Sequence, residues 1–188
     1  MKKGLIIGGS IVAVIIVLIM MISGTYNGLI NKEEDVESKL ANISVQLERR
    51  ADLIPNLVST VKGYASHESE VINSITTSRE NLLKANNVGE MAEANAELTS
   101  ALNNLLVVVE NYPDLKANTN FIQLQDELAG TENRIAVARK DYNDSVQEFN
   151  RSVKRFPQNI LANMFGFDEK EYFEAKETSN DVPNVSFE

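Results

Sequence analysis

The sequence predicts an all-α protein: an N-terminal transmembrane helix, an antiparallel bundle of three to four long helices, a short C-terminal helix and an extended tail. Three observations lead to this fold class. Residues 4–23 are uncharged and apolar, apolar residues recur every seven positions before Pro157, and strand-like alternation of apolar and polar residues is almost absent. The soluble part is long enough to bury one sizeable core, so we expect a single bundle.

Residues 4–23 (GLIIGGSIVAVIIVLIMMIS) form the predicted anchor. These twenty positions carry no charge, and as a helix they span about 30 Å, the hydrocarbon thickness of a bilayer. The alternative is a cleaved signal peptide, but the apolar part of such a peptide is only about 7 to 15 residues long. In addition, Ile22 stands where cleavage would need a small residue. The lipid bilayer is therefore the expected partner of residues 4–23.

The orientation of the anchor follows from the lysines near its two ends. Lys2 and Lys3 adjoin the apolar run, whereas Lys32 and Lys39 lie several residues beyond it. Because positive charge close to the membrane stays on the cytoplasmic side, we expect residues 1–3 to be cytoplasmic. The predicted location is the cytoplasmic (inner) membrane, crossed once, with the C-terminal domain outside the cytoplasm.

A first apolar stripe predicts helix over residues 36–82. The stripe stays in phase across Pro55. Either Asp52 caps a new helix with Pro55 in its first turn, or one helix continues through the proline with a kink. Both alternatives make the two halves nearly collinear. The stripe consists of Val36, Leu40, Ile43, Leu47, Ile54, Leu57, Val61, Tyr64, Val71, Ile75 and Leu82.

Two further long helices are predicted. A turn at residues 86–89 precedes a helix over about residues 90–110, which the sequence NYPD at 111–114 closes. A seven-residue repeat then predicts one helix over about residues 119–156, because the residue before Pro157 avoids helical geometry. The repeat consists of Phe121, Leu128, Ile135, Tyr142, Phe149 and Phe156.

The region after Pro157 has a different character, with four of the seven phenylalanines among acidic and turn-forming residues. We expect a short helix over residues 159–164 and an extended tail beyond it. Phe165 and Phe167 are expected to pack back on the bundle. For Phe187 we do not choose between packing on the bundle and contact with a partner. The predicted boundaries place the bundle at residues 24–167 and an acidic, aromatic-containing tail at 168–188.

Composition excludes several classes of function. The chain carries 27 acidic and 18 basic residues, a formal charge of −9, so its surface would repel nucleic acid. With no Cys, it has no disulfide, no thiolate nucleophile and no Cys-ligated metal. The only His is His67, which with Glu70 would make half a metal site on one helix face. A solvated helical His is the commoner case, so we predict no catalytic, cofactor-binding or metal-binding residues and no enzymatic activity.

Arg50 is the polar residue that falls on the apolar stripe. One hypothesis is that it pairs with Glu127 or Glu132 of the long helix and fixes the register of the bundle, as charged groups near a bundle core often do. The alternative is a polar inter-helical cleft, formed with Arg49, Asp52 and His67, that binds a ligand or a substrate.

The chain resembles the LemA family over nearly all of its length after the anchor. The resemblance rests on YNGL at residues 26–29, VQLERRADLIPNLV at 45–58, VKGYA at 61–65, ENYPDLKAN at 110–118, GTENRI at 130–135 and FGF at 165–167. Leu40 departs from the family pattern, which often has Trp there. The resemblance implies a bacterial single-pass membrane protein with a long-helix bundle outside the cytoplasm, and it carries over no catalytic residues.

The resulting functional hypothesis is a membrane-anchored helical scaffold or interaction protein of the bacterial cell envelope. Its expected partner is an envelope protein or a second copy of the chain. The alternative is a ligand-binding or enzymatic module that uses the polar cleft around Arg49, Arg50, Asp52 and His67.

Overall fold

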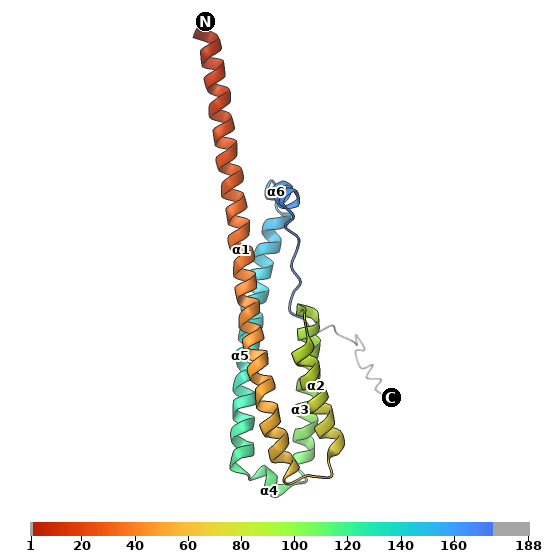
Figure 1. The fold of residues 1–188 in the computed structure, drawn as a ribbon. Coiled ribbons are helices and arrows are strands. Elements are labelled where there is room, and N and C mark those ends of the chain that lie inside the picture. The colour runs from red at the N-terminus through yellow and green to blue at the C-terminus, as the bar shows by residue number, and fades with distance from the viewer. Residues whose placement is uncertain (1, 175–188) are drawn as a thin grey trace, which may run out of the picture. The chain divides into compact units, whose positions relative to one another are not determined.

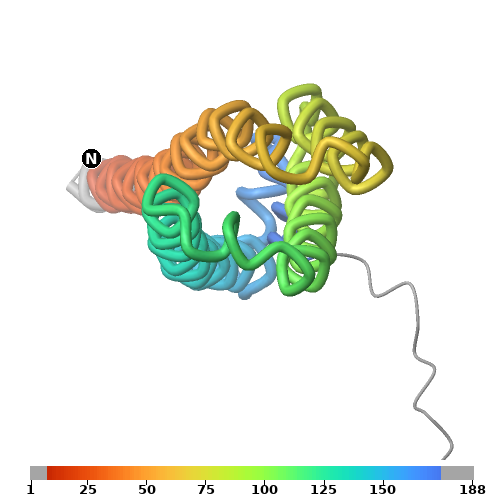
Figure 2. Tube along the Cα trace, turned by 90° about the horizontal axis from the view of Figure 1, so that it is seen from below, coloured from red at the N-terminus to blue at the C-terminus, as the bar shows by residue number. Residues whose placement is uncertain are grey.

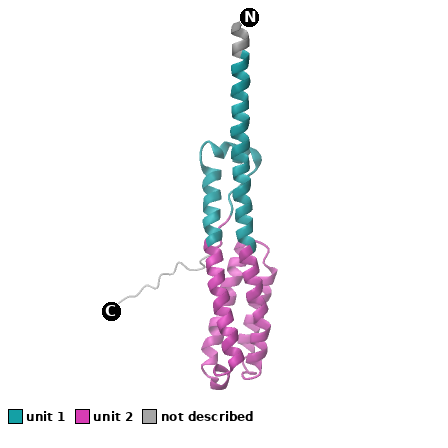
Figure 3. Cartoon of the chain, turned by 90° about the vertical axis from the view of Figure 1, so that its left-hand side faces the viewer, with its two compact units in different colours: residues 1–41, 141–170 teal, residues 42–140, 171–188 magenta. Residues whose placement is uncertain are grey.

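The computed structural model describes the backbone of residues 2–174 and the side chains of residues 8–174. The all-α prediction is confirmed, because no strand occurs among these residues (Figure 1). The helices are α1 (Lys2–Lys62), α2 (Ser69–Lys84), α3 (Val88–Val109), α4 (Pro113–Lys116), α5 (Thr119–Lys154) and α6 (Gln158–Phe165). The chain divides into two compact units, residues 1–41 with 141–170 (unit 1) and residues 42–140 with 171–188 (unit 2) (Figure 3). The predicted domain boundaries at residues 23 and 167 remain predictions.

α1 begins with the predicted anchor. It contains a segment long and apolar enough to cross a membrane, with a mean hydropathy of 2.3. No protein covers that segment, and its large apolar side chains between Ile11 and Ile22 are 37–61% exposed. Apolar surface of this extent is unfavourable in water and favourable in lipid. The chain is therefore a membrane-associated helical protein.

Unit 1 packs the part of α1 that follows the apolar segment against the end of α5. Its core contains Leu29 of α1 and Tyr142, Val146 and Phe149 of α5, each at most 2% exposed. A salt bridge also links α1 to α5 at the surface, since the ammonium of Lys32 lies 2.8 Å from a carboxylate oxygen of Glu148. The repeat in α5 thus buries its residues as predicted up to Phe149.

Two aromatic residues at and after the end of α6, Phe165 and Phe167, contact rings of α1 and α5. The Tyr26 ring makes edge contacts with Phe165 and Phe167, at centroid distances of 4.9 and 5.8 Å, and Phe149 makes a third with Phe167 at 6.4 Å. The expectation that Phe165 and Phe167 pack back on the bundle is confirmed. Phe187 lies outside the described residues.

Asn150 of α5 holds the segment after α6 in place. Its side-chain amide donates to the carbonyl of Lys170 at 2.9 Å, and its side-chain oxygen accepts from the N–H of Lys170 at 2.8 Å. Asn150 is 6% exposed, so an apolar replacement would leave two backbone groups without these partners. We expect Asn150→Leu to lower the free energy of unfolding by about 2 kcal/mol.

Chemical denaturation of the detergent-solubilised chain, followed by circular dichroism, measures this loss. Asn133→Leu on the same helix is the control, since Asn133 is exposed. A loss of equal size in the two variants would contradict the role of Asn150.

In unit 2, α1 ends at Lys62, and α2 begins at Ser69 after a loop. The prediction of helix through residues 63–68 is therefore wrong. The chain folds back because α2 buries Ile72, Ile75 and Leu82 by pairing with α3, a partner that a straight continuation of α1 would not meet. Figure 2 shows α2 and α3 side by side, with α4 crossing the near end.

The boundaries of α3 and α5 are set by asparagine caps. The side chain of Asn87 accepts from the N–H of Glu90 at 2.8 Å, and that of Asn118 accepts from the N–H of Phe121 at 3.0 Å. Each satisfies one of the free donors at a helix start. The predicted helices over residues 90–110 and 119–156 are confirmed, with ends that differ by at most two residues. The short α4 was not predicted.

α1 continues through Pro55, which confirms the continuous alternative. Because proline has no N–H, the carbonyl of Ala51 lacks its normal helical donor. The guanidinium Nε of Arg79 in α2 replaces it, donating to that carbonyl at 2.7 Å. Arg79 thus supplies the hydrogen bond that α1 lacks at Pro55 and links α2 to α1.

We expect Arg79→Ala to lower the free energy of unfolding by about 1.5 kcal/mol, because a bond from a charged donor to a buried carbonyl is lost. In a Pro55→Ala background the same change should cost clearly less, because the restored N–H at position 55 can bond to Ala51. A double-mutant cycle measured by chemical denaturation tests this coupling. Equal losses of unfolding free energy in both backgrounds would show that the contribution of Arg79 does not depend on the N–H that Pro55 lacks.

Candidate functional site

Arg50 lies on the buried face of α1 in unit 2 and is 3% exposed. One guanidinium nitrogen, Nη1, donates to the side-chain oxygen of Asn95 in α3 at 2.6 Å. The same nitrogen lies 2.6 Å from a carboxylate oxygen of Glu132 in α5. Arg50 therefore joins three helices through one ionic and polar cluster.

Burial lowers the pKa of Arg50, and the negative charge of Glu132 partly opposes this effect. The guanidinium nevertheless stays charged, since its ordinary pKa lies far above neutral pH. Within the described residues, the Nε of Arg50 has no hydrogen-bond partner, and the Glu132 oxygen is close to Nη1 without hydrogen-bond alignment. The cluster is thus strongly held but keeps unused hydrogen-bonding capacity.

A cavity of about 380 Å³ in unit 2 adjoins this cluster. Arg50 and Glu132 line it together with apolar side chains that include Leu57, Leu105 and Phe121. At its mouth, Leu106 of α3 is 45% exposed, and Asp126 of α5 is also exposed. The arrangement is a largely apolar groove between α3 and α5 with a buried cation at its floor.

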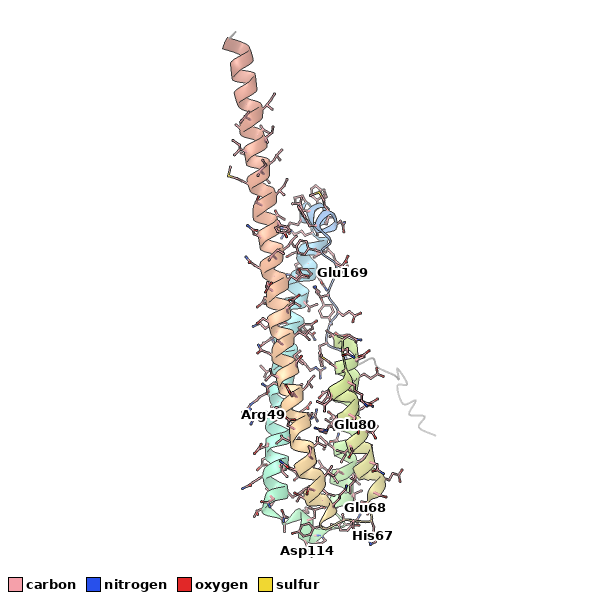
Figure 4. All side chains as sticks on the ribbon, viewed as in Figure 1. Arg49, His67, Glu68, Glu80, Asp114 and Glu169 are labelled. Carbon is pink, nitrogen blue, oxygen red and sulfur yellow. The ribbon has the colours of Figure 1, made fainter. Side chains whose placement is uncertain are left out.

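The structure places the predicted site residues in different surroundings. Arg50 lines the cavity, whereas Arg49, Asp52 and His67 are exposed and do not line it. Figure 4 shows Arg49 partway along α1 and His67 beside Glu68 and Asp114 at the end where α1 turns towards α2. The predicted four-residue cleft is therefore wrong in its membership, because one residue step turns a side chain by about 100° around a helix.

His67 lies in the loop before α2, so its predicted place on a helix face with Glu70 is wrong. Neighbouring side chains of this end have structural contacts: Tyr112 donates to Glu68 at 2.8 Å, and Asn118 donates to the Tyr64 hydroxyl at 2.9 Å. The bond to Glu68 raises the pKa of Tyr112. In the described part of the chain, no three His, Asp or Glu residues gather closely enough to hold a metal ion.

Pairing of Arg50 with Glu132 confirms one of the two partners predicted for it, while Glu127 is exposed. Sequence reasoning missed Asn95, although a signal was present. Asn95 lies between Met91 and Leu98 with the spacing of the buried face of α3. A polar residue at that position pointed to a polar contact inside the bundle.

Comparison with known proteins finds relatives of this chain. The model of the LemA family matches residues 39–187. Magnetosome protein MamQ 2 of Paramagnetospirillum magneticum is 28% identical over 94% of this chain and 73% of that protein. Magnetosome protein MamQ of Magnetospirillum gryphiswaldense is 27% identical over the same shares. Protein LemA of Metamycoplasma hominis is 25% identical over 82% of this chain and 71% of that protein.

Proposed function

We propose that this chain, which belongs to the LemA family, is a membrane-anchored helical scaffold or interaction protein of the bacterial cell envelope. In this proposal the groove between α3 and α5 receives an apolar segment of a partner protein. The proposal assigns no catalytic residue and no enzymatic activity. The anchor tethers the chain to the membrane, to which the bound partner would then be held.

The groove is the observation that carries this proposal. Its walls are mostly apolar, and Leu106 of α3, which lines it, presents apolar surface at 45% exposure. Amphipathic helices commonly bind by placing apolar side chains into such inter-helical grooves. A volume of about 380 Å³ accommodates several side chains of a segment, which suits recognition of a short motif.

The acidic residues near the groove indicate which charge the partner segment should carry. Asp126 and Glu127 are exposed along α5 near the groove, and the whole chain carries a charge of −9. Complementary charge steers association and suppresses wrong partners. We therefore expect the bound segment to be an amphipathic helix with apolar residues on one face and lysine or arginine beside them.

Site-specific photo-crosslinking in cells tests the groove. A photoreactive phenylalanine analogue at Leu106 should give a discrete adduct, and Asp126→Lys should reduce its yield. The control position is Leu83 of α2, which is 50% exposed and does not line the groove. Equal adducts from both positions, or none, would contradict the proposal. An adduct of two copies of this chain would assign the groove to self-association.

The proposed orientation, with the N-terminus in the cytoplasm and the bundle outside it, has its own test. Ser66 is exposed, and the chain has no Cys, so Ser66→Cys creates a unique thiol. We expect a membrane-impermeant maleimide to label it in intact spheroplasts, with lysed cells as the control. Labelling only after lysis would reverse the orientation and move the search for partners to the cytoplasm.

The unused hydrogen-bonding capacity of Arg50 favours a second candidate function, the binding of a small ligand in the same cavity. An apolar pocket in which the buried Nε of Arg50 has no hydrogen-bond partner suits an amphiphile whose acidic head would accept from that nitrogen. We expect decanoate to raise the melting temperature of the detergent-free nanodisc-held chain, and Arg50→Gln to abolish this rise. No rise in the unmodified chain would remove this candidate.

A further inference from the structure

α6 has its apolar surface on the side that faces away from the protein. Ile160 and Met164, four residues apart and so on one helix face, are 57% and 62% exposed, whereas Ala162 is fully buried. Phe156, just before the helix, is 75% exposed, and Phe165 at its end is 45% exposed. A helix exposed to water normally shows the reverse pattern, with polar residues outward.

The position of α6 in unit 1 indicates that its exposed apolar side chains lie close to the membrane surface. The rings of Phe165 and Phe167 contact Tyr26 of α1. Tyr26 follows Ser23, the last residue of the apolar run, by three residues, or about 4.5 Å along the helix. Figure 1 shows α6 beside α1 just below its projecting N-terminal part. α6 therefore lies at the level where α1 leaves the hydrocarbon of the bilayer.

The residues around α6 suit the headgroup region. Tyr and other aromatic side chains favour the boundary between lipid and water, and Tyr26, Phe156 and Phe165 supply them here. Arg151, in the last turn of α5, and Arg155, just after its end, are both exposed and line a cavity of about 450 Å³ with Lys32. Glu148 and Asp144 line the same cavity, and Lys32 pairs with Glu148. The three basic residues outnumber these two carboxylates, so the lining keeps a net positive charge that favours lipid phosphates.

We propose that α6 is an interfacial membrane helix that inserts Phe156, Ile160 and Met164 into the leaflet from which α1 emerges. The chain then contacts the bilayer at two points, through the spanning part of α1 and through α6. An interfacial helix buries its apolar face about 5 to 10 Å deep at the boundary of headgroups and acyl chains. Because α6 packs on α1 through Tyr26 within unit 1, this second contact limits the tilt and rotation of unit 1 relative to the membrane.

Tryptophan fluorescence of the full chain in lipid nanodiscs tests the proposal. The chain has no Trp, so Ile160→Trp introduces a unique emitter on the outward face of α6. Asp141→Trp is the matched control, because Asp141 is exposed in the same unit and lies about 20 Å along α5 from its end at Lys154. Met164→Trp serves as a second reporter if the first variant does not fold.

We expect lipids brominated high in the acyl chain to remove most of the emission of Ile160→Trp and little of that of Asp141→Trp. Iodide in the aqueous phase should quench the two variants in the opposite order. Iodide quenching of Ile160→Trp equal to the control, without quenching by brominated lipid, would overturn the proposal. Protection of Ile160→Trp from both quenchers would also overturn it, because protein rather than lipid would then cover α6.

Discussion

Arg50→Ala is expected to lower the free energy of unfolding by about 3 kcal/mol, measured by chemical denaturation of the detergent-solubilised chain. Breaking a buried ion pair from one side costs about 3 to 5 kcal/mol. The lower end applies here because the side chain of Glu132 is 39% exposed, so water can solvate the carboxylate that remains. The amide of Asn95, which is 3% exposed, would also lose its donor.

Arg49→Ala provides the matched control. Arg49 is the neighbouring residue of the same type, but it is exposed, so its loss should change the free energy of unfolding by less than about 0.5 kcal/mol. Replacing the pair together, as Arg50→Met with Glu132→Leu, should recover most of the loss, since an apolar pair of similar volume avoids the desolvation of charge. Similar values for Arg50→Ala and Arg49→Ala would show that the cluster does not hold the bundle.

An ion pair of Arg50 with either Glu127 or Glu132 could be predicted because helical periodicity determines which residues lie near a shared face. Glu132 lies four residues after Leu128 and three before Ile135, both buried, so it adjoins the core. Glu127 lies four residues before the buried Thr131, so the spacing alone did not decide between the two acids. The cavity beside Arg50 could not be predicted, because it depends on how closely side chains of α1, α3 and α5 fill the space between them. Periodicity carries no information on that fit.

Local sequence patterns also explain why α5 was predicted correctly and why the loop at residues 63–68 was not. The long repeat in α5 is a local pattern that one helix satisfies by itself, and its end at Pro157 is imposed by sterics. The loop at residues 63–68 has no proline, and the stripe stays in phase on both sides of it. Only the burial of α2 against α3, a contact between helices, decides that the chain folds back there. Tyr64, counted in the stripe, is accordingly 45% exposed.

Phe149→Ala is the second substitution with a large expected effect, a loss of about 3 to 5 kcal/mol in the free energy of unfolding. Phe149 is fully buried in unit 1, and removing a buried phenyl ring costs the transfer free energy of its carbons and leaves a cavity. Its ring also makes an edge contact with Phe167 at 6.4 Å and lies 5.8 Å from the ammonium of Lys170. Each of these contacts adds about 0.5 to 1 kcal/mol.

Phe156→Ala is the control for Phe149→Ala, because it removes a phenylalanine that is not buried. Phe156 belongs to the same seven-residue repeat but is 75% exposed, because α5 ends at Lys154 before reaching it. Its removal should leave the free energy of unfolding in detergent nearly unchanged. Phe149→Ala should also weaken the hold of α5 on Phe167, so the segment after α6 should become more open to limited proteolysis. Equal stability of the two variants would mean that the return of the chain after α6 does not depend on the α5 core.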